Sequence, residues 1–181
     1  YAFNSTFNYI SAARFAAKQV KKFLQLPVTL ITNSYTEGFD SVVVIDDVNK
    51  SIRQYRISDT EILELEWFNH SRTSAYTLSP YDKTLLIDAD YFMFNNSLKI
   101  MFDTNSEFAC FNEINDITSI NTVQHRLSST SIPMQWATVI YFTKSNLAKS
   151  IFEFMEIIKN HWEYYALLYH FNSKKYRNDF A

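Results

Sequence analysis

The stretch most decisive for the fold is Lys83-Thr84-Leu85-Leu86-Ile87-Asp88-Ala89-Asp90. Its apolar middle is typical of a buried strand, and two carboxylates follow it directly. Like charges this close raise each other's pKa, and burial adds to the cost. A divalent cation removes the conflict, because Mg²⁺ and similar hard cations take carboxylate oxygens together with substrate phosphates. We therefore predict that Asp88 and Asp90 bind Mn²⁺ or Mg²⁺.

Strand alternation sets the geometry expected for this site. If the chain stays extended beyond Ile87, the side chains of Asp88 and Asp90 point to the same side. Ala89 between them is small, so a ligand can approach the backbone there. The alternative is a pair of surface acids at a strand end, since a bare Asp-x-Asp is common by chance.

Strand and helix patterns alternate along the rest of the chain. The elements we expect are a strand tail at 1–3, a helix at 8–24, strands at 28–32 and 41–45, a helix at 67–78, a short helix at 97–102, strands at 107–111 and 137–142, and a long helix from 145 that breaks near 161 and resumes to 168. Residues 50–63 have no clear period, and 112–133 are polar and irregular. The pattern predicts one α/β domain whose ligand lies beyond the carboxyl ends of the strands.

Composition limits the classes of function. The 181 residues are 47% hydrophobic, enough for a packed core, and the net charge of −2 argues against strong non-specific nucleic-acid binding. Gly38 is the single glycine, which excludes a glycine-rich phosphate loop. The single cysteine, Cys110, lies in an apolar run and is expected to be buried, which fits a reducing, cytoplasmic compartment. No apolar run is long enough to span a membrane.

Residues 79–90, Ser-Pro-Tyr-Asp-Lys-Thr-Leu-Leu-Ile-Asp-Ala-Asp, resemble the core signature of GT-A fold glycosyltransferases, especially the family-eight group that is glycogenin-like and galactosyltransferase-like. In that group such a run leads to the Asp-x-Asp that binds metal. The resemblance implies a Rossmann-like, mixed and mostly parallel central sheet flanked by helices. It also implies transfer of a hexosyl or pentosyl group from a nucleotide-diphosphate sugar, most often a UDP-sugar, to an acceptor hydroxyl.

Further landmarks come in the order of that family. Residues 1–6, the following helix and residues 27–33 resemble the nucleotide pocket. The resemblance places four residues near the base and ribose: Phe3, Asn4, Thr6 and Asn33. Arg72 resembles the basic residue that reaches the donor's phosphates or sugar, with a surface arginine as the alternative. Asp88 and Ala89 complete the implied donor contacts.

Two later segments resemble the sugar and acceptor side of the site. Residues 133–142, Pro-Met-Gln-Trp-Ala-Thr-Val-Ile-Tyr-Phe, are similar to the landmark N-x-G-V-[IL]-x-F, but Trp-Ala-Thr stands where asparagine and glycine are usual. Gln135 is implied as a catalytic residue there. Trp136 is implied to stack on the donor, and a core tryptophan is the alternative. Asp179, in Arg-Asn-Asp at 177–179, resembles the later acidic landmark and is implied as the second catalytic residue, serving as base if the reaction inverts.

The resemblance has one gap, since the histidine-containing segment that supplies a third metal ligand is not matched by any of the four histidines. We therefore expect residues 1–181 to be a single GT-A-like domain that lacks its extreme N-terminus and a C-terminal segment. Two alternatives stay open: a catalytically inactive nucleotide-sugar-binding domain, and a nucleotidyltransferase. The acceptor is a glycan, a protein or a modified nucleic acid, and the basic residues Lys174, Lys175 and Arg177 are compatible with the last.

Overall fold

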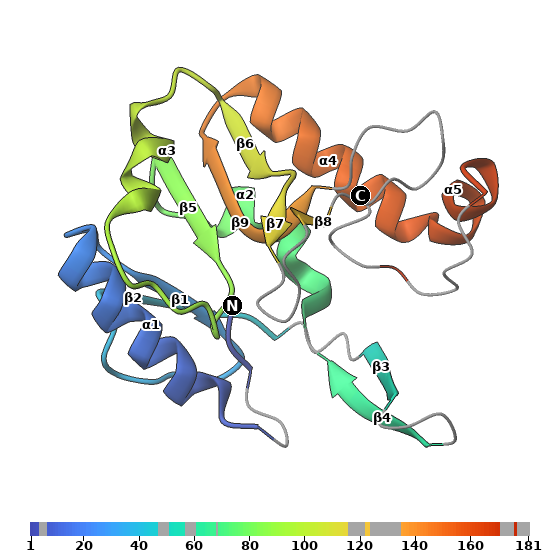
Figure 1. The fold of residues 1–181 in the computed structure, drawn as a ribbon, viewed down its shortest axis with the longest axis horizontal. Coiled ribbons are helices and arrows are strands. Elements are labelled where there is room, and N and C mark those ends of the chain that lie inside the picture. Colours follow the sequence, from blue (N-terminus) through green and yellow to red (C-terminus); the bar gives the residue numbers. More distant parts are fainter. Residues whose placement is uncertain are drawn as a thin grey trace. The chain divides into compact units, whose positions relative to one another are not determined.

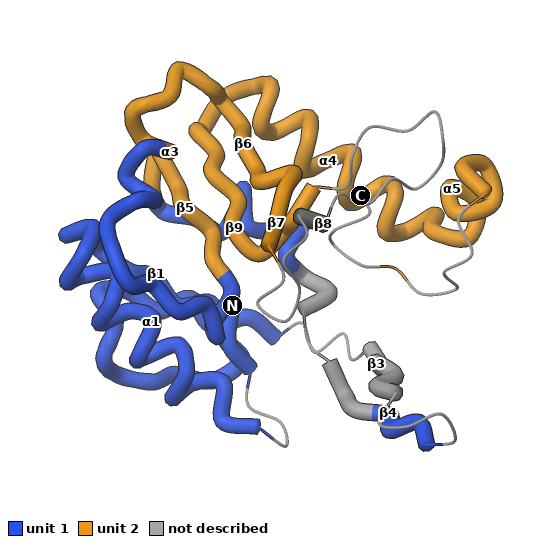
Figure 2. The backbone as a smooth tube through the Cα atoms, viewed as in Figure 1, with its two compact units in different colours: residues 1–80, 88–100 blue, residues 81–87, 101–181 orange. Residues whose placement is uncertain are grey.

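The computed structural model describes residues 1–3, 7–46, 51–56, 61–67, 69–115, 122–123, 135–170 and 176. The chain divides into two compact units, and Figure 2 colours them separately. Unit 1 contains residues 1–80 and 88–100, and unit 2 contains residues 81–87 and 101–181. Both helices and strands are present, so the expected α/β class is confirmed (Figure 1).

Unit 1 begins with a helix between extended segments. Helix α1 (Tyr9–Phe23) buries one face, including Ile10, Ala13 and Val20, and the side chain of Asn8 accepts a hydrogen bond from the Ser11 N–H at its start. Strands β1 (Thr29–Thr32) and β2 (Ser41–Val44) pair in parallel. The Ala2 N–H donates to the Ile31 carbonyl at 2.9 Å, so residues 1–3 run beside β1 without being assigned as a strand.

The connection between β1 and β2 is short for a parallel pair. Gly38 turns it with a φ of +101°, which glycine adopts at little cost. Arg14 on α1 donates to the Glu37 carbonyl at 3.2 Å and to the Thr36 hydroxyl at 2.6 Å. Asp40 lies at the end of this connection. The hydrogen bond from the Val28 N–H, and to a lesser extent Lys21, holds the pKa of Asp40 below its usual range. Side chains of α1 thus hold the short connection between β1 and β2 in place.

The region at 50–63, which has no clear period in the sequence, contributes to an antiparallel pair of strands. Strands β3 (Ser51–Arg56) and β4 (Ile62–Trp67) pair antiparallel, with Ser51 opposite Trp67. The helix expected at 67–78 is confirmed from residue 69 onward, as the 3₁₀ helix η1 (Asn69–Ser74) followed by α2 (Ala75–Leu78).

Unit 2 is built on three strands in the order β5, β9, β6, which Figure 1 shows side by side. These are β5 (Lys83–Ile87), β9 (Trp136–Thr143) and β6 (Phe108–Phe111), and both outer strands are antiparallel to β9. The central strand carries the most buried side chains, since Tyr141 and Phe142 are both 0% exposed. The short helices η2 (Ser97–Lys99) and α3 (Ile100–Asp103) come before β6, and the two-residue strands β7 (Ile114–Asn115) and β8 (Thr122–Val123) pair after it.

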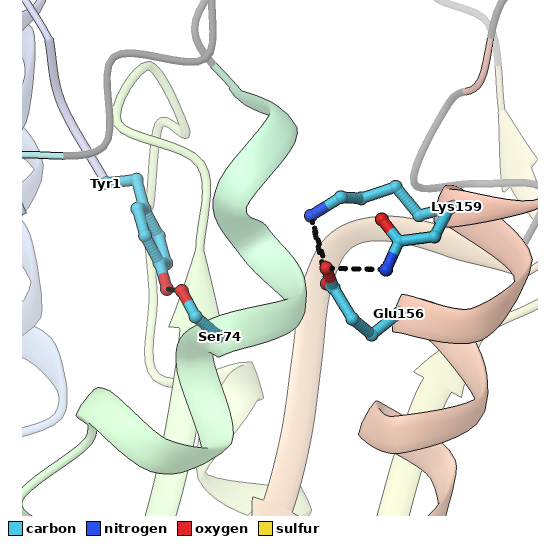
Figure 3. A network of polar contacts seen from close by, with 5 residues as sticks. Tyr1, Ser74, Glu156 and Lys159 are labelled. Carbon is cyan, nitrogen blue, oxygen red and sulfur yellow. Dashed lines mark hydrogen bonds and ion pairs between the residues drawn. The ribbon is translucent and has the colours of Figure 1, made fainter.

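Helix α4 (Asn146–Asn160) packs on one face of this sheet through aromatic rings. The Phe152 ring lies edge-on to Phe142 at 4.9 Å and to Phe108 at 5.8 Å between centroids. The helix starts at Ser145, whose hydroxyl accepts from the Ala148 N–H, and Glu156 in its last turns contacts Lys159 and Asn160 (Figure 3). It breaks at His161, as expected, and α5 (Trp162–Leu168) follows.

A mostly parallel central sheet was the wrong expectation for the described strands. Only the β1–β2 pairing among them is parallel, and the other pairings are antiparallel. Residues 57–61 alone join β3 to β4, and a connection so short permits only an antiparallel pair. Because β5 and β6 are both antiparallel to β9, they run in the same direction as each other.

Cys110 lies opposite Ile140 in the β6–β9 pair and is half-buried, less enclosed than expected. Burial raises the pKa of its thiol to about 12 from an ordinary value of 9.0.

We expect a disulfide reagent at pH 8 to modify the native protein at least about tenfold more slowly than the urea-unfolded protein, since the thiolate is the reactive form. The free energy of unfolding should also fall as the pH rises above about 9, where the unfolded thiol ionises and the native thiol does not. Equal modification rates in the two states would contradict this.

Candidate functional site

The two aspartates lie in a turn and not on an extended strand. Strand β5 ends at Ile87, and the Tyr91 N–H then donates to the Asp88 carbonyl at 3.1 Å. The alternation expected to carry Asp88 and Asp90 to the same side therefore does not apply, because a turn rotates successive side chains away from the strand pattern. Asp90 is exposed, whereas the Asp88 side chain is 27% exposed.

Arg72 is the cation next to this turn. Its side chain is 4% exposed, and its guanidinium pairs with the Asp88 carboxylate within unit 1. The surface-arginine alternative is therefore wrong. A buried guanidinium requires a partner, and a charge-assisted contact to a carboxylate supplies one. The charge of Asp88 is thus compensated by the protein itself.

A hydrogen bond holds the 3₁₀ helix η1 that carries Arg72. The Tyr1 hydroxyl and the Ser74 hydroxyl lie 3.0 Å apart, and Figure 3 shows the Tyr1 ring directed at Ser74. Burial raises the pKa of the Tyr1 phenol to about 12, although Ser74 and Arg72 act in the opposite direction. The phenol therefore stays neutral at physiological pH and serves as a hydrogen-bonding group. Sequence reasoning did not single out either hydroxyl, because their contact joins residues 73 apart in the chain.

The other expected donor contacts in unit 1 occupy different environments. Phe3 is 5% exposed, and its ring lies 6.4 Å from that of Tyr1. Ala89 is partly buried and packs against the core cluster of Ala2, Ile10, Ala13 and Leu30. Asn33 directly follows β1 and is exposed.

The residues expected on the sugar and acceptor side belong to unit 2. Gln135 is half-buried and precedes β9. Trp136 is the first residue of β9, is half-buried, and lies opposite Phe111 beyond an irregularity in the register after Cys110. Asn4, Thr6 and Asp179 lie outside the described residues, as do Lys174, Lys175 and Arg177.

Asp88 and Asp90 are the donor set that a cation would use. Across the described ranges, no group of three histidine, cysteine, aspartate or glutamate side chains could hold a metal ion. Two carboxylates nevertheless fit Mg²⁺ or Mn²⁺ chemically, since such sites commonly take one or two carboxylates and complete the shell with water and substrate phosphates. Among the described residues this turn supplies two carboxylates at most, so water or phosphate would have to complete the shell of any cation bound there.

No helix within the described part of the chain is long and apolar enough to cross a bilayer. Comparison of the chain with models of protein families, with curated proteins and with solved structures finds no match.

Proposed function

We propose that the protein transfers a sugar from a nucleotide-diphosphate sugar to an acceptor hydroxyl, as a GT-A-like glycosyltransferase. The observation that carries the proposal is the pair of the buried Arg72 with Asp88, in the turn that directly follows the apolar strand β5 and that also holds the exposed Asp90. In such an arrangement the carboxylates can bind a metal ion, and the guanidinium can pair with the phosphates whose charge the metal neutralises. The resemblance of residues 79–90 to the GT-A signature supports the sugar donor.

The N-terminal part of unit 1 gives further support. Residues 1–3, α1 and β1 form an extended–helix–strand unit, with Ala2 bonded to Ile31. Units of this kind bind nucleotides beyond the carboxyl ends of their strands. Asn33 follows such an end and is exposed, so its amide is accessible to a base or ribose.

The chemistry that we propose assigns a task to each group. Asp88 and Asp90 hold Mn²⁺ or Mg²⁺, and Arg72 attracts the diphosphate. When bound, the cation supplies Lewis-acid neutralisation of the charge on the leaving group. The bond from the anomeric carbon to the diphosphate breaks and its electron pair leaves with the nucleoside diphosphate, while the acceptor oxygen bonds to the anomeric carbon. The acceptor proton passes to a carboxylate base in an inverting reaction, the role that the family resemblance implies for Asp179, or to the departing phosphate oxygen in a retaining one.

Donor binding tests the proposal. Isothermal titration with a panel of UDP-sugars should show donor affinity rising by about tenfold or more, or ~1.4 kcal/mol, when Mn²⁺ is added. Asp90→Ala should abolish the Mn²⁺-dependent part of the affinity, because it removes an exposed oxygen ligand without disturbing the Arg72–Asp88 pair. Asp103→Ala, which removes another exposed aspartate, is the control and should bind like the wild type. A donor affinity that changes neither on addition of Mn²⁺ nor in Asp90→Ala would refute the proposed function.

A catalytically inactive nucleotide-sugar-binding domain is the second candidate. It is favoured by the ion pair that occupies Asp88 and by the lack of a third metal-ligand side chain among the described residues. Slow hydrolysis of a UDP-sugar by the purified protein with Mn²⁺ distinguishes the two, since an inactive domain binds the donor and leaves it intact.

A further inference from the structure

Two phenylalanine rings from separate segments meet on the surface of unit 1. Phe15 on α1 and Phe92 beyond the acidic turn lie 5.5 Å apart between ring centroids, and unit 1 contains both (Figure 2). The contact leaves them open to water, since Phe15 is 46% and Phe92 is 60% exposed. Burial then alternates as in an extended chain, with Met93 buried and Phe94 82% exposed, so Phe92 and Phe94 face outward together. Apolar rings exposed as a group mark a surface for interaction.

Positive charge adjoins these rings on α1. Lys18 and Lys22 follow Phe15 by three and seven positions, which places all three side chains on one side of the helix, and all three are exposed. No acidic residue occurs in α1. Lys21 is paired with Asp40 at 3.1 Å, whereas no ion pair within the described ranges involves Lys18 or Lys22. Two lysine charges therefore stay uncompensated beside the rings.

Helix α4 shows that exposed rings alone do not define such a surface. Phe154 is 62% exposed there, but the neighbouring Lys149 and Glu153 pair with each other at 3.7 Å, so their charges cancel. On unit 1 the opposing group in the segment of Phe92 is Asp90, which is exposed and precedes it by two residues. One carboxylate against two ammonium groups leaves an excess of positive charge next to the rings.

We propose that Phe15, Lys18, Lys22, Phe92 and Phe94, the basic aromatic face of unit 1, dock on an anionic lipid surface. The rings enter the boundary between headgroups and acyl chains, and the two lysines contact the anionic headgroups. Phenylalanine has no polar tip, which suits this boundary, whereas single-stranded nucleic acid requires a basic groove that follows its backbone. The proposal is independent of sugar transfer, since it involves neither a nucleotide nor a metal ion.

Co-sedimentation of the intact protein with lipid vesicles tests this docking. The two probes are vesicles of phosphatidylcholine alone and vesicles of equal parts of phosphatidylcholine and phosphatidylserine. We expect binding to the anionic vesicles to be about 25-fold tighter, because each of the two lysines contributes about fivefold near an anionic surface. Added salt should weaken this preference, since it screens the attraction.

Two variants separate charge from apolar contact. Lys18→Gln combined with Lys22→Gln should remove the preference for anionic vesicles. Phe94→Ala should weaken binding to anionic vesicles by about tenfold, through loss of a ring that the fold does not bury. The matched controls are on α4: Lys149→Gln and Phe154→Ala remove the same groups from exposed positions and should bind like the wild type.

Several results would overturn the docking proposal. These are equal binding to both kinds of vesicle, no binding to anionic vesicles, and losses in the α4 controls as large as those in the α1 and Phe94 variants. A dimer in sedimentation equilibrium that Phe94→Ala disperses would assign the face to a second copy of the chain. Tighter binding to single-stranded DNA than to vesicles, lost in the double lysine variant, would assign it to nucleic acid. None of these measurements bears on donor binding, so the proposed function stands or falls separately.

Discussion

Replacing Arg72 with methionine should lower the free energy of unfolding by about 3 kcal/mol. The substitution keeps much of the apolar stem and removes the guanidinium, which leaves the Asp88 carboxylate without its protein counter-ion. Loss of one partner from a buried pair usually costs ~3–5 kcal/mol. We expect the lower end of that range, because the Asp88 side chain is 27% exposed and keeps contact with water. Urea unfolding followed by circular dichroism measures the change.

A double-mutant cycle separates the ion pair from the packing of Arg72. Arg72→Met combined with Asp88→Asn should be more stable than Arg72→Met alone, because the unpaired charge is then gone. Arg14→Met is the matched control, since Arg14 is exposed and its loss should cost about 1 kcal/mol or less. Additive effects of the two substitutions at Arg72 and Asp88 would show that the pair does not contribute as a pair.

Replacing Phe152 with alanine should destabilise unit 2 by about 3–5 kcal/mol. Phe152 is 3% exposed, and its ring contacts Phe142 and Phe108 from the buried face of α4. The substitution removes the two edge-to-face contacts and leaves a cavity between the helix and the β5–β9–β6 sheet. Alanine also favours helix, so the loss cannot be attributed to helix propensity.

Phe154, two residues further along the same helix, provides the control. It is 62% exposed, so Phe154→Ala removes the same ring from the same element without opening a cavity. Its unfolding free energy should stay within about 0.5 kcal/mol of the wild type. A comparable loss of unfolding free energy in both variants would mean that α4 does not bury the face that carries Phe152. Guanidinium unfolding of the two variants side by side makes the comparison.

Local patterns predicted most of the helices and strands. The helix expected at 8–24 is α1, and the expected break near 161 separates α4 from α5. The strand at 83–87 is β5 with identical bounds. These predictions succeed because the spacing of apolar residues acts within a few residues of chain. No element was predicted at 50–63, because this region carries no periodic signal. Its strand β3 is defined by backbone pairing with β4.

The sequence pointed to the residues of the candidate site and not to their arrangement. Arg72, Asp88 and Asp90 were all expected to act together, yet the pairing of Arg72 with Asp88 joins residues 16 apart in the sequence. The turn after Ile87 also removed the alternation on which their common direction depended. Charge repulsion between two aspartates pointed to a metal, whereas the folded chain brings a guanidinium to one of them.

The amino-acid sequence of this protein determines its α/β class and the positions of its main helices and strands, because each depends on residues adjacent in the chain. Folding decided the directions of the strands, the partner of Asp88 and the burial of Arg72. Those properties depend on which distant segments pack together, and packing energy is a property of the assembled core that no local pattern contains.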